Sequence, residues 1–86
     1  MDILEMKSLN EHLKRVLSLS FNIPLEEISE DKTLNEIGIK KSDLILINHI
    51  LEQEFDIRIS TIEQFEQIQN SRRISDLIEF IEKNQY

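Results

Sequence analysis

The sequence predicts a small all-α protein, a bundle of three longer helices and one short helix with a long first loop. Apolar residues recur at the spacing of a helical face in three separate segments. The turn residues on which small strand-rich domains depend are scarce, because Gly38 is the only glycine and Pro24 the only proline among 86 residues. A chain of this length is expected to form one domain over residues 1–86.

The first helix is predicted in the segment that begins near Ser8. Ser8 suits the N-cap position, and Glu11 lies three residues later, as in a capping box. Residues 3–6 either extend this helix or form a turn before it. The apolar face has the spacing i, i+4, i+7 and i+8 and consists of Leu9, Leu13, Val16 and Leu17.

No helical period holds between residues 20 and 41. An irregular stretch of about 20 residues in a compact domain is expected to be packed or functional. Its apolar content predicts that it lies across the core, and Pro24 is well placed to open a short helical turn that reaches Ile28. The apolar residues of this stretch are Phe21, Ile23, Leu25, Ile28, Leu34, Ile37 and Ile39.

The second helix is predicted from Ser42, as N-cap, to about Phe55, with Asp43 favourably placed for the helix dipole. A buried stripe is expected at Leu44, Ile47, Leu51 and Phe55. Four further residues widen the apolar arc beyond one core face: Ile45, Leu46, His49 and Ile50. A helix that is apolar around most of its circumference is either central or presents a face to a partner.

Residues 56–59 are expected to form a loop that turns its isoleucines inward. The segment Ser60–Glu63 matches a capping box and predicts a short helix that carries Ile62, Phe65 and Ile68. The last helix is predicted over residues 71–83, with a pair of arginines, 72 and 73, capping or preceding it. Its apolar face consists of Ile74, Leu77, Ile78 and Ile81.

Composition excludes several functions. The formal net charge of −7 argues against nucleic-acid binding, and one glycine cannot build a phosphate-binding loop. There is no cysteine, and the two histidines, His12 and His49, fall on different predicted helices, so no metal site is expected. No paired acid and base suggests a catalytic centre. The acidic start and short apolar runs predict a cytoplasmic protein without membrane insertion.

Two segments carry the most specific pattern, Thr33–Ile39, which reads TLNEIGI, and Leu51–Ile59, which reads LEQEFDIRI. Their order and spacing resemble the acyl carrier and peptidyl carrier protein family over about residues 9–83. The family pattern is a hydrophobic-x-glutamate-leucine-glycine run, then Asp-Ser-Leu at the second helix, then leucine-x-x-x-phenylalanine before an isoleucine. The segment Phe65–Ile81 is similar in length to the peptidyl and D-alanyl branch.

The resemblance implies a carrier-protein-like four-helix bundle that is not itself an enzyme. It also implies partners that handle acyl or aminoacyl groups in fatty acid, polyketide or nonribosomal peptide biosynthesis. Family members attach 4'-phosphopantetheine to the serine of Asp-Ser-Leu. Counting without gaps, forward from Gly38 or backward from Phe55, places Lys40-Lys41-Ser42 on that triplet.

The phosphopantetheine serine is therefore replaced by Lys41, and a lysine amine cannot accept this phosphodiester. Ser42 could serve only after a shift of one residue, which rotates its hydroxyl by about 100° around the helix axis. Family members are typically acidic on the exposed face of the second helix. Here Lys40 stands at the aspartate position and Leu46 at a frequently acidic one, which should weaken binding to basic partners.

Three hypotheses remain open. The first is a divergent carrier with phosphopantetheine on Ser42. The second is a degenerate carrier fold that acts as an interaction or regulatory module and is monomeric when alone. The gapless count to Lys41 and the positive charge of Lys40 at the aspartate position favour it. The third is an unrelated helical adaptor. For the second we expect partner contacts through the second helix, at Lys40, Lys41, Ile45, Leu46, His49 and Glu52.

Overall fold

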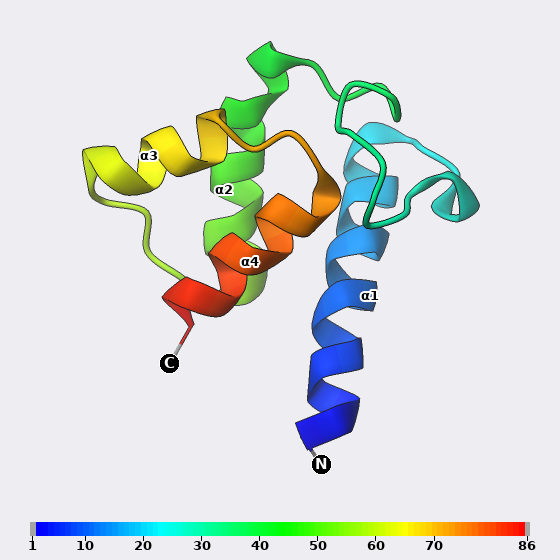
Figure 1. The fold of residues 1–86 in the computed structure, drawn as a ribbon, viewed down its shortest axis with the longest axis horizontal. Coiled ribbons are helices and arrows are strands. Elements are labelled where there is room, and N and C mark those ends of the chain that lie inside the picture. The colour runs from blue at the N-terminus through cyan, green and yellow to red at the C-terminus, as the bar shows by residue number, and fades with distance from the viewer. Residues whose placement is uncertain (1, 86) are drawn as a thin grey trace.

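The protein folds as four helices arranged around one apolar core (Figure 1). The computed structural model describes the backbone of residues 2–85 and the side chains of residues 9–85. The long helices are α1 (Asp2–Phe21), α2 (Leu44–Phe55) and α4 (Ile74–Asn84), and the short one is α3 (Ile62–Gln69). Within residues 2–85 no strand forms, and the predicted all-α bundle is confirmed.

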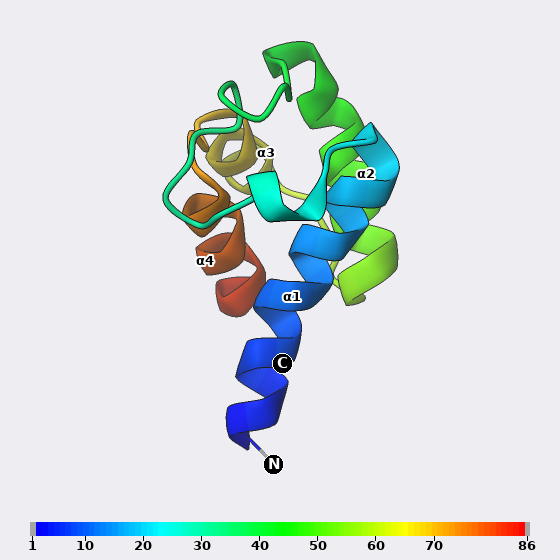
Figure 2. The same cartoon turned by 90° about the vertical axis from the view of Figure 1, so that its right-hand side faces the viewer.

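The helix α1 is longer than predicted and begins at Asp2. Ser8 therefore lies inside the helix and is not its N-cap, so that prediction is wrong. Whether residues 3–6 also pack lies outside the described side chains. The chain leaves α1 at Asn22, which adopts the left-handed conformation with φ of 57°, as Asn often does at helix ends. In Figures 1 and 2 the first turns of α1 extend beyond the other helices.

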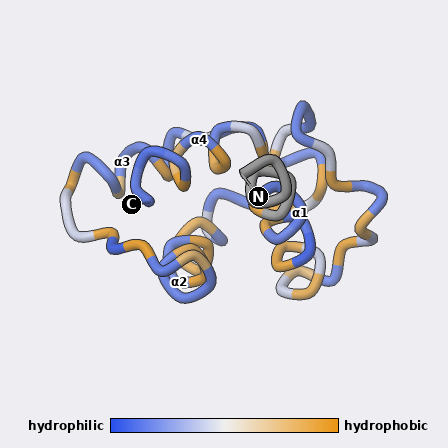
Figure 3. Tube along the Cα trace, turned by 90° about the horizontal axis from the view of Figure 1, so that it is seen from below, coloured by the Kyte–Doolittle hydropathy of each residue, from blue (hydrophilic) through white to orange (hydrophobic). Residues whose placement is uncertain are grey.

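Most apolar residues of the long connection between α1 and α2 are buried in the core, as predicted. Figure 3 shows apolar segments, in orange, along this connection. Its short 3-10 turn η1 (Leu25–Glu27) follows Pro24 directly. Leu25 is an exception, because its side chain is 46% exposed rather than buried. Gly38 has a φ of +97°, a conformation that side-chain-bearing residues rarely adopt, so the only glycine sits where the backbone requires one.

The core is drawn from every helix and from the first loop. It holds the predicted stripes of α2 and α4, together with Ile57 from the loop between α2 and α3 and Ile68 from α3. The apolar residues buried in it are Leu13, Leu17, Ile23, Ile28, Leu34, Ile37, Ile39, Leu44, Ile47, Leu51, Phe55, Ile57, Ile68, Ile74, Leu77, Ile78, Phe80 and Ile81. The loop 56–59 thus turns isoleucines inward, as expected, with Ile59 partly buried.

Two helix starts differ from their predictions by a residue or more. The capping box of α3 uses Thr61 and Gln64 rather than Ser60 and Glu63: the Gln64 N–H donates to Thr61 Oγ1 at 3.1 Å. The helix α4 begins at Ile74, where the backbone N–H groups of Arg72 and Arg73 donate to Asp76 Oδ2 at 2.9 and 3.1 Å. The two arginines thus precede the last helix, as predicted.

Candidate functional site

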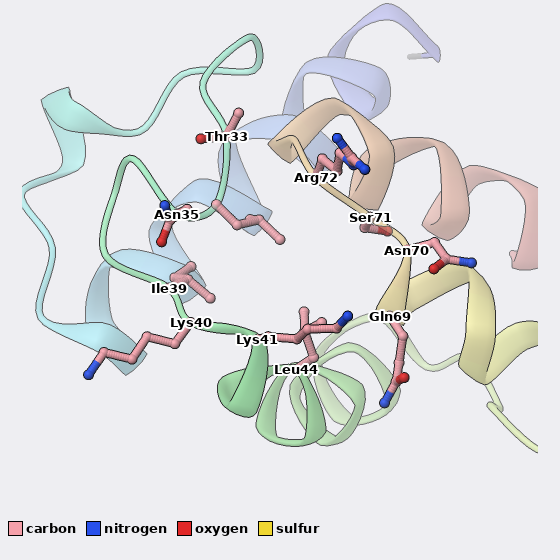
Figure 4. Close-up of a pocket in the computed structure, with 11 residues that line it drawn as sticks. Thr33, Asn35, Ile39, Lys40, Lys41, Leu44, Gln69, Asn70, Ser71 and Arg72 are labelled. Atoms are coloured by element: carbon pink, nitrogen blue, oxygen red, sulfur yellow. The ribbon is translucent and has the colours of Figure 1, made fainter.

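An open cleft of about 630 Å³ lies beside the N-terminal end of α2 (Figure 4). Its walls are the end of the first loop and the link between α3 and α4, segments that lie about 30 residues apart in the chain. The lining residues are 33–35, 39–41, Leu44 and 69–72. The cleft therefore includes Lys40 and Lys41 and ends next to Ser42, so it adjoins the position at which the carrier pattern places its prosthetic group.

Backbone hydrogen bonds hold the two walls together. The Leu34 N–H donates to the Arg72 carbonyl at 2.7 Å, and the Ile74 N–H donates to the Lys32 carbonyl at 3.3 Å. Thr33 and Arg73 form an isolated bridge between the same segments. Because these bonds join the first loop to the start of α4, the shape of the cleft depends on both segments.

Thr33 and Glu36 tighten the loop next to the cleft. The Thr33 N–H donates to Glu36 Oε1 at 2.8 Å, and the Glu36 N–H donates to Thr33 Oγ1 at 3.1 Å. The Thr33 hydroxyl also donates to Glu36 Oε1, at 3.2 Å. The bond from the Thr33 N–H first, and that from its hydroxyl second, favour the ionised carboxylate and hold the pKa of Glu36 below its usual value. Across the loop, the hydroxyl of Ser29 lowers the pKa of Asp31 in the same way.

The turn before α2 is organised by Asp43 and not by Ser42. Residues Lys41–Asp43 form a 3-10 turn, η2, that leads into α2. The Lys40 N–H donates to Asp43 Oδ2 at 2.9 Å, and the Asp43 N–H donates to the Lys40 carbonyl at 2.9 Å. The prediction that Ser42 is the N-cap is therefore wrong: a carboxylate three residues after Lys40 satisfies the free backbone donor instead.

The residues at this turn fit a phosphopantetheine group poorly. Lys41 is exposed and carries an amine, not the hydroxyl that the phosphodiester needs. Ser42 is exposed, and its hydroxyl has no hydrogen-bond partner among the described residues. Ser42 is therefore the one residue of this turn, Lys40–Asp43, whose side chain could accept the group.

The exposed face of α2 is apolar near this turn. Ile45 is 67% and Leu46 45% exposed, and His49 is exposed one turn later, whereas Ile50 is buried. Glu52 is half-buried, and its Oε2 accepts the Ile59 N–H at 2.8 Å, so it also supports the loop after α2. The structure therefore brings Lys40, Lys41, Ile45 and Leu46 to one end of α2.

The other histidine lies elsewhere. His12 Nε2 lies 3.3 Å from Glu54 Oε1, and its ring packs on Phe55 with the centroids 4.7 Å apart, which joins α1 to the end of α2. Among residues 9–85 no group of three His, Asp or Glu side chains is placed to hold a metal ion. In the described part of the chain no helix has the length and apolar content to span a membrane.

Sequence reasoning missed the α3–α4 wall of the cleft. Arg72 lines it, together with the amide side chains of Gln69 and Asn70. Residues 69–73 carry no carboxylate, but longer runs without one occur elsewhere, such as residues 12–25, so the sequence offered no specific signal. Residues 69–73 also have no periodicity, so only the folded chain shows that they face Lys41.

The four helices around one core form the bundle of a small helical carrier protein. The chain is 31% identical over 75 residues to the acyl carrier protein of Buchnera aphidicola subsp. Acyrthosiphon pisum (strain 5A), covering 86% of this chain and 92% of that protein. It is 29% identical over 79 residues to the acyl carrier protein of strain APS, covering 91% and 94%. An acyl carrier protein homolog of Mycoplasmopsis pulmonis is 39% identical over 57 residues, covering 66% and 73%.

The chain therefore belongs to the acyl carrier protein family, whose members are carriers and not enzymes. No family model matches it, and no solved structure matches it. Family membership over most of the chain overturns the third hypothesis, an unrelated helical adaptor.

Proposed function

We propose that this member of the acyl carrier protein family is a docking module that binds partner proteins through the N-terminal part of α2, without a prosthetic group at the family position. The proposal rests on counting without gaps from Gly38 or from Phe55, which assigns Lys41, with an amine and no hydroxyl, to the position of the phosphopantetheine serine. The proposed partners are cytoplasmic enzymes that handle acyl or aminoacyl groups, or a protein that regulates them.

The surface around α2 supports docking. Ile45 and Leu46 expose apolar area that the fold does not use, and apolar surface of this kind is typical of interaction sites. Lys40 and Lys41 flank it with positive charge, and His49 and Glu52 continue it along the helix. Because positive charge replaces the acidity of the family pattern, the partner surface should be less basic than that of ordinary carrier partners.

A second candidate function is a working carrier with its arm on Ser42. One observation favours it: the Ser42 hydroxyl is exposed and takes no part in capping the helix. Both candidates can therefore be tested on the same residue.

The first experiment is an intact mass measurement after incubation with coenzyme A and a broad-specificity phosphopantetheinyl transferase. We expect no mass gain for the natural sequence. A gain that disappears in Ser42→Ala would contradict the proposal and establish the second candidate. Lys41→Ser tests whether only the acceptor is missing, since modification of this variant would show that the surface still admits the transferase.

Docking is tested with two matched substitutions of exposed isoleucines. Ile45→Asp places a charge on the α2 face, and Ile62→Asp makes the same change on α3, where Ile62 is 78% exposed. Proteins cross-linked by the natural chain should be retained by Ile62→Asp and lost with Ile45→Asp. Equal loss in both variants would argue that α2 is not the docking face.

A further inference from the structure

We propose that the partner of the docking face is an acidic amphipathic helix, and that it binds across α2 and the end of α1. The surface in question, the α1–α2 strip, consists of the exposed residues Arg15, Leu19, Lys40 and Leu46. The inference rests on the proposed docking role of α2, names the chemistry of the partner, and adds α1 to the docking surface.

One contact fixes how α1 and α2 lie beside each other. His12 Nε2 on α1 is 3.3 Å from Glu54 Oε1 on α2, and the His12 ring packs on Phe55. The two helices run in opposite directions, and Figures 1 and 2 agree that the end of α1 lies beside the first half of α2. A step of two turns forward along α1 therefore corresponds to a step of two turns back along α2.

This register brings Leu19 level with Leu46. Leu19 follows His12 by seven residues, so it lies on the same side of α1 and about 10 Å further along. Leu46 precedes Glu54 by eight residues, which places it on the same side of α2 as Glu54. Because the two leucines are 79% and 45% exposed, the strip has an apolar centre that the fold leaves open to water.

Ile50 supports this placement. It lies four residues from both Leu46 and Glu54, on the same side of α2. Among the described residues it is the only buried apolar residue that does not belong to the core cluster. Burial outside the core is what a residue between α1 and α2 should show, so Ile50 provides an apolar floor beneath the strip.

The helix segments that carry the strip have no negative charge. Residues 12–25 and residues 44–51 contain no carboxylate, although the chain has 17 acidic residues and a net charge of −7. Arg15 and Lys40 are exposed, and neither forms an ion pair with another described residue. Figure 4 shows that the Lys40 side chain points away from the cleft and from Lys41. Both cations are therefore free to meet the carboxylates of a partner.

The nearest carboxylates of the chain itself lie at the margins of the strip. Asp43 accepts the Lys40 N–H at 2.9 Å, and Glu54 lies beside His12. Glu11 is one turn before Arg15 on α1 but forms no ion pair with it. The charge at the centre of the strip thus remains uncompensated within the described residues.

These features favour one kind of partner. A helix that docks on two neighbouring helices presents apolar side chains at the spacing i, i+3 or i+4, and i+7. Such a stripe covers the two turns from His12 to Leu19 and removes Leu19 and Leu46 from water, which is favourable. Carboxylates beside the stripe would face Arg15 and Lys40, whereas a basic helix would be repelled.

The first experiment selects partners without assuming their sequence. A phage-displayed library of helical peptides of about 18 residues, long enough to form a helix on binding, is panned against the full chain. We expect the enriched peptides to share an apolar stripe of helical spacing and to carry more aspartate and glutamate than lysine and arginine. Enrichment of basic peptides, or no enrichment over an uncoated surface, would overturn the proposal.

Two matched pairs of variants then locate the binding site of an enriched peptide. Leu19→Ser is compared with Leu25→Ser, since Leu25 is also exposed but lies in η1, which Figure 1 shows on the side of α1 away from α2. Arg15→Gln is compared with Arg58→Gln, which removes the same charge after the far end of α2. Leu19→Ser should weaken binding about fivefold or more, and Arg15→Gln about two- to fivefold. Each control should change the affinity less than about twofold.

The Ile45→Asp variant separates failure of this inference from failure of the docking proposal. Equal affinities of Leu19→Ser and Leu25→Ser, together with loss of the peptide in Ile45→Asp, would keep α2 as a docking face and refute the strip across α1. Peptides that bind Leu19→Ser and Ile45→Asp as tightly as the natural chain would refute both. Weakening in Leu19→Ser and Arg15→Gln but not in their controls is the result that we expect.

Discussion

The helices α2 and α4 are similar in length, at 12 and 11 residues, and each buries five apolar side chains. They differ on their outer faces. The described exposed positions of α4 are charged, at Glu79, Glu82 and Lys83, whereas α2 exposes Ile45 and Leu46 near its start. Packing within this chain accounts for every apolar residue of α4 but not for those two. The proposed docking role would account for this excess on α2, for which the fold has no use.

The largest effect is expected on the buried faces of α2 and α4, in which the two helices are alike. Leu51 and Leu77 are both fully buried, so Leu51→Ala and Leu77→Ala should each cost about 2–5 kcal/mol of unfolding free energy. Urea denaturation followed by circular dichroism measures both. A loss below about 1 kcal/mol in one variant would show that its helix packs less tightly than its partner.

A polar atom on the inner side of α2 sharpens the comparison. Asn48 Oδ1 is buried without a hydrogen-bond partner among the described residues, and α4 has no such atom. Asn48→Leu should therefore stabilise the protein by about 1 kcal/mol, because an unsatisfied buried group is removed. Asn48→Ala controls for helix propensity, and a destabilised leucine variant would indicate that the amide makes contacts of its own.

The caps of the two helices should differ in strength. Asp76 accepts two backbone N–H groups before α4, while Asp43 accepts one before α2. We expect Asp76→Ala to cost about 1 kcal/mol or more and Asp43→Ala less, as for other N-terminal caps. Thermal unfolding of both variants measures the difference, and the reverse order would contradict the importance of the second bond.

The outer face of α2 should be nearly neutral for folding. Ile45→Asp is expected to change the unfolding free energy by less than about 0.5 kcal/mol, since its side chain is largely exposed. Glu79→Ala is the control at an exposed position of α4, although it removes a charge where Ile45→Asp adds one. Unfolding of Ile45→Asp would mean that the apolar excess of α2 belongs to the core after all.

The smallest effect concerns Glu36 in the first loop. This loop leads into α2 and is hydrogen-bonded to the start of α4. The pKa of Glu36 is lowered in the folded chain, so its stabilising contribution is present above the unfolded-state pKa, about 4.3. That contribution is lost as the pH falls through the lower folded-state pKa. The difference in melting temperature between the natural chain and Glu36→Gln should therefore shrink as the pH falls from 6 to 3. A constant difference would show that the Thr33 bonds do not favour the charged carboxylate.

Much of the fold was predictable because it depends on local periodicity. Every residue predicted for the buried face of α4 is buried, and so is the predicted stripe of α2 from Leu44 to Phe55, but the buried Phe80 was not predicted. Helix starts were less predictable, since Ser42 and Asp43 are both good N-terminal residues and only the folded backbone selects between them. Leu25 was expected inside and lies outside, because nothing in its neighbours encodes which side of a 3-10 turn faces the core.

The sequence by itself predicted the helical class and the family, because these depend on spacing along the chain. Only the tertiary structure decided that Ile45 and Leu46 stay outside and that Lys41 and Arg72 line one cleft. Those features depend on which distant segments pack together. The hydrogen bond from the Leu34 N–H to the Arg72 carbonyl joins residues 38 positions apart, and no local pattern encodes it.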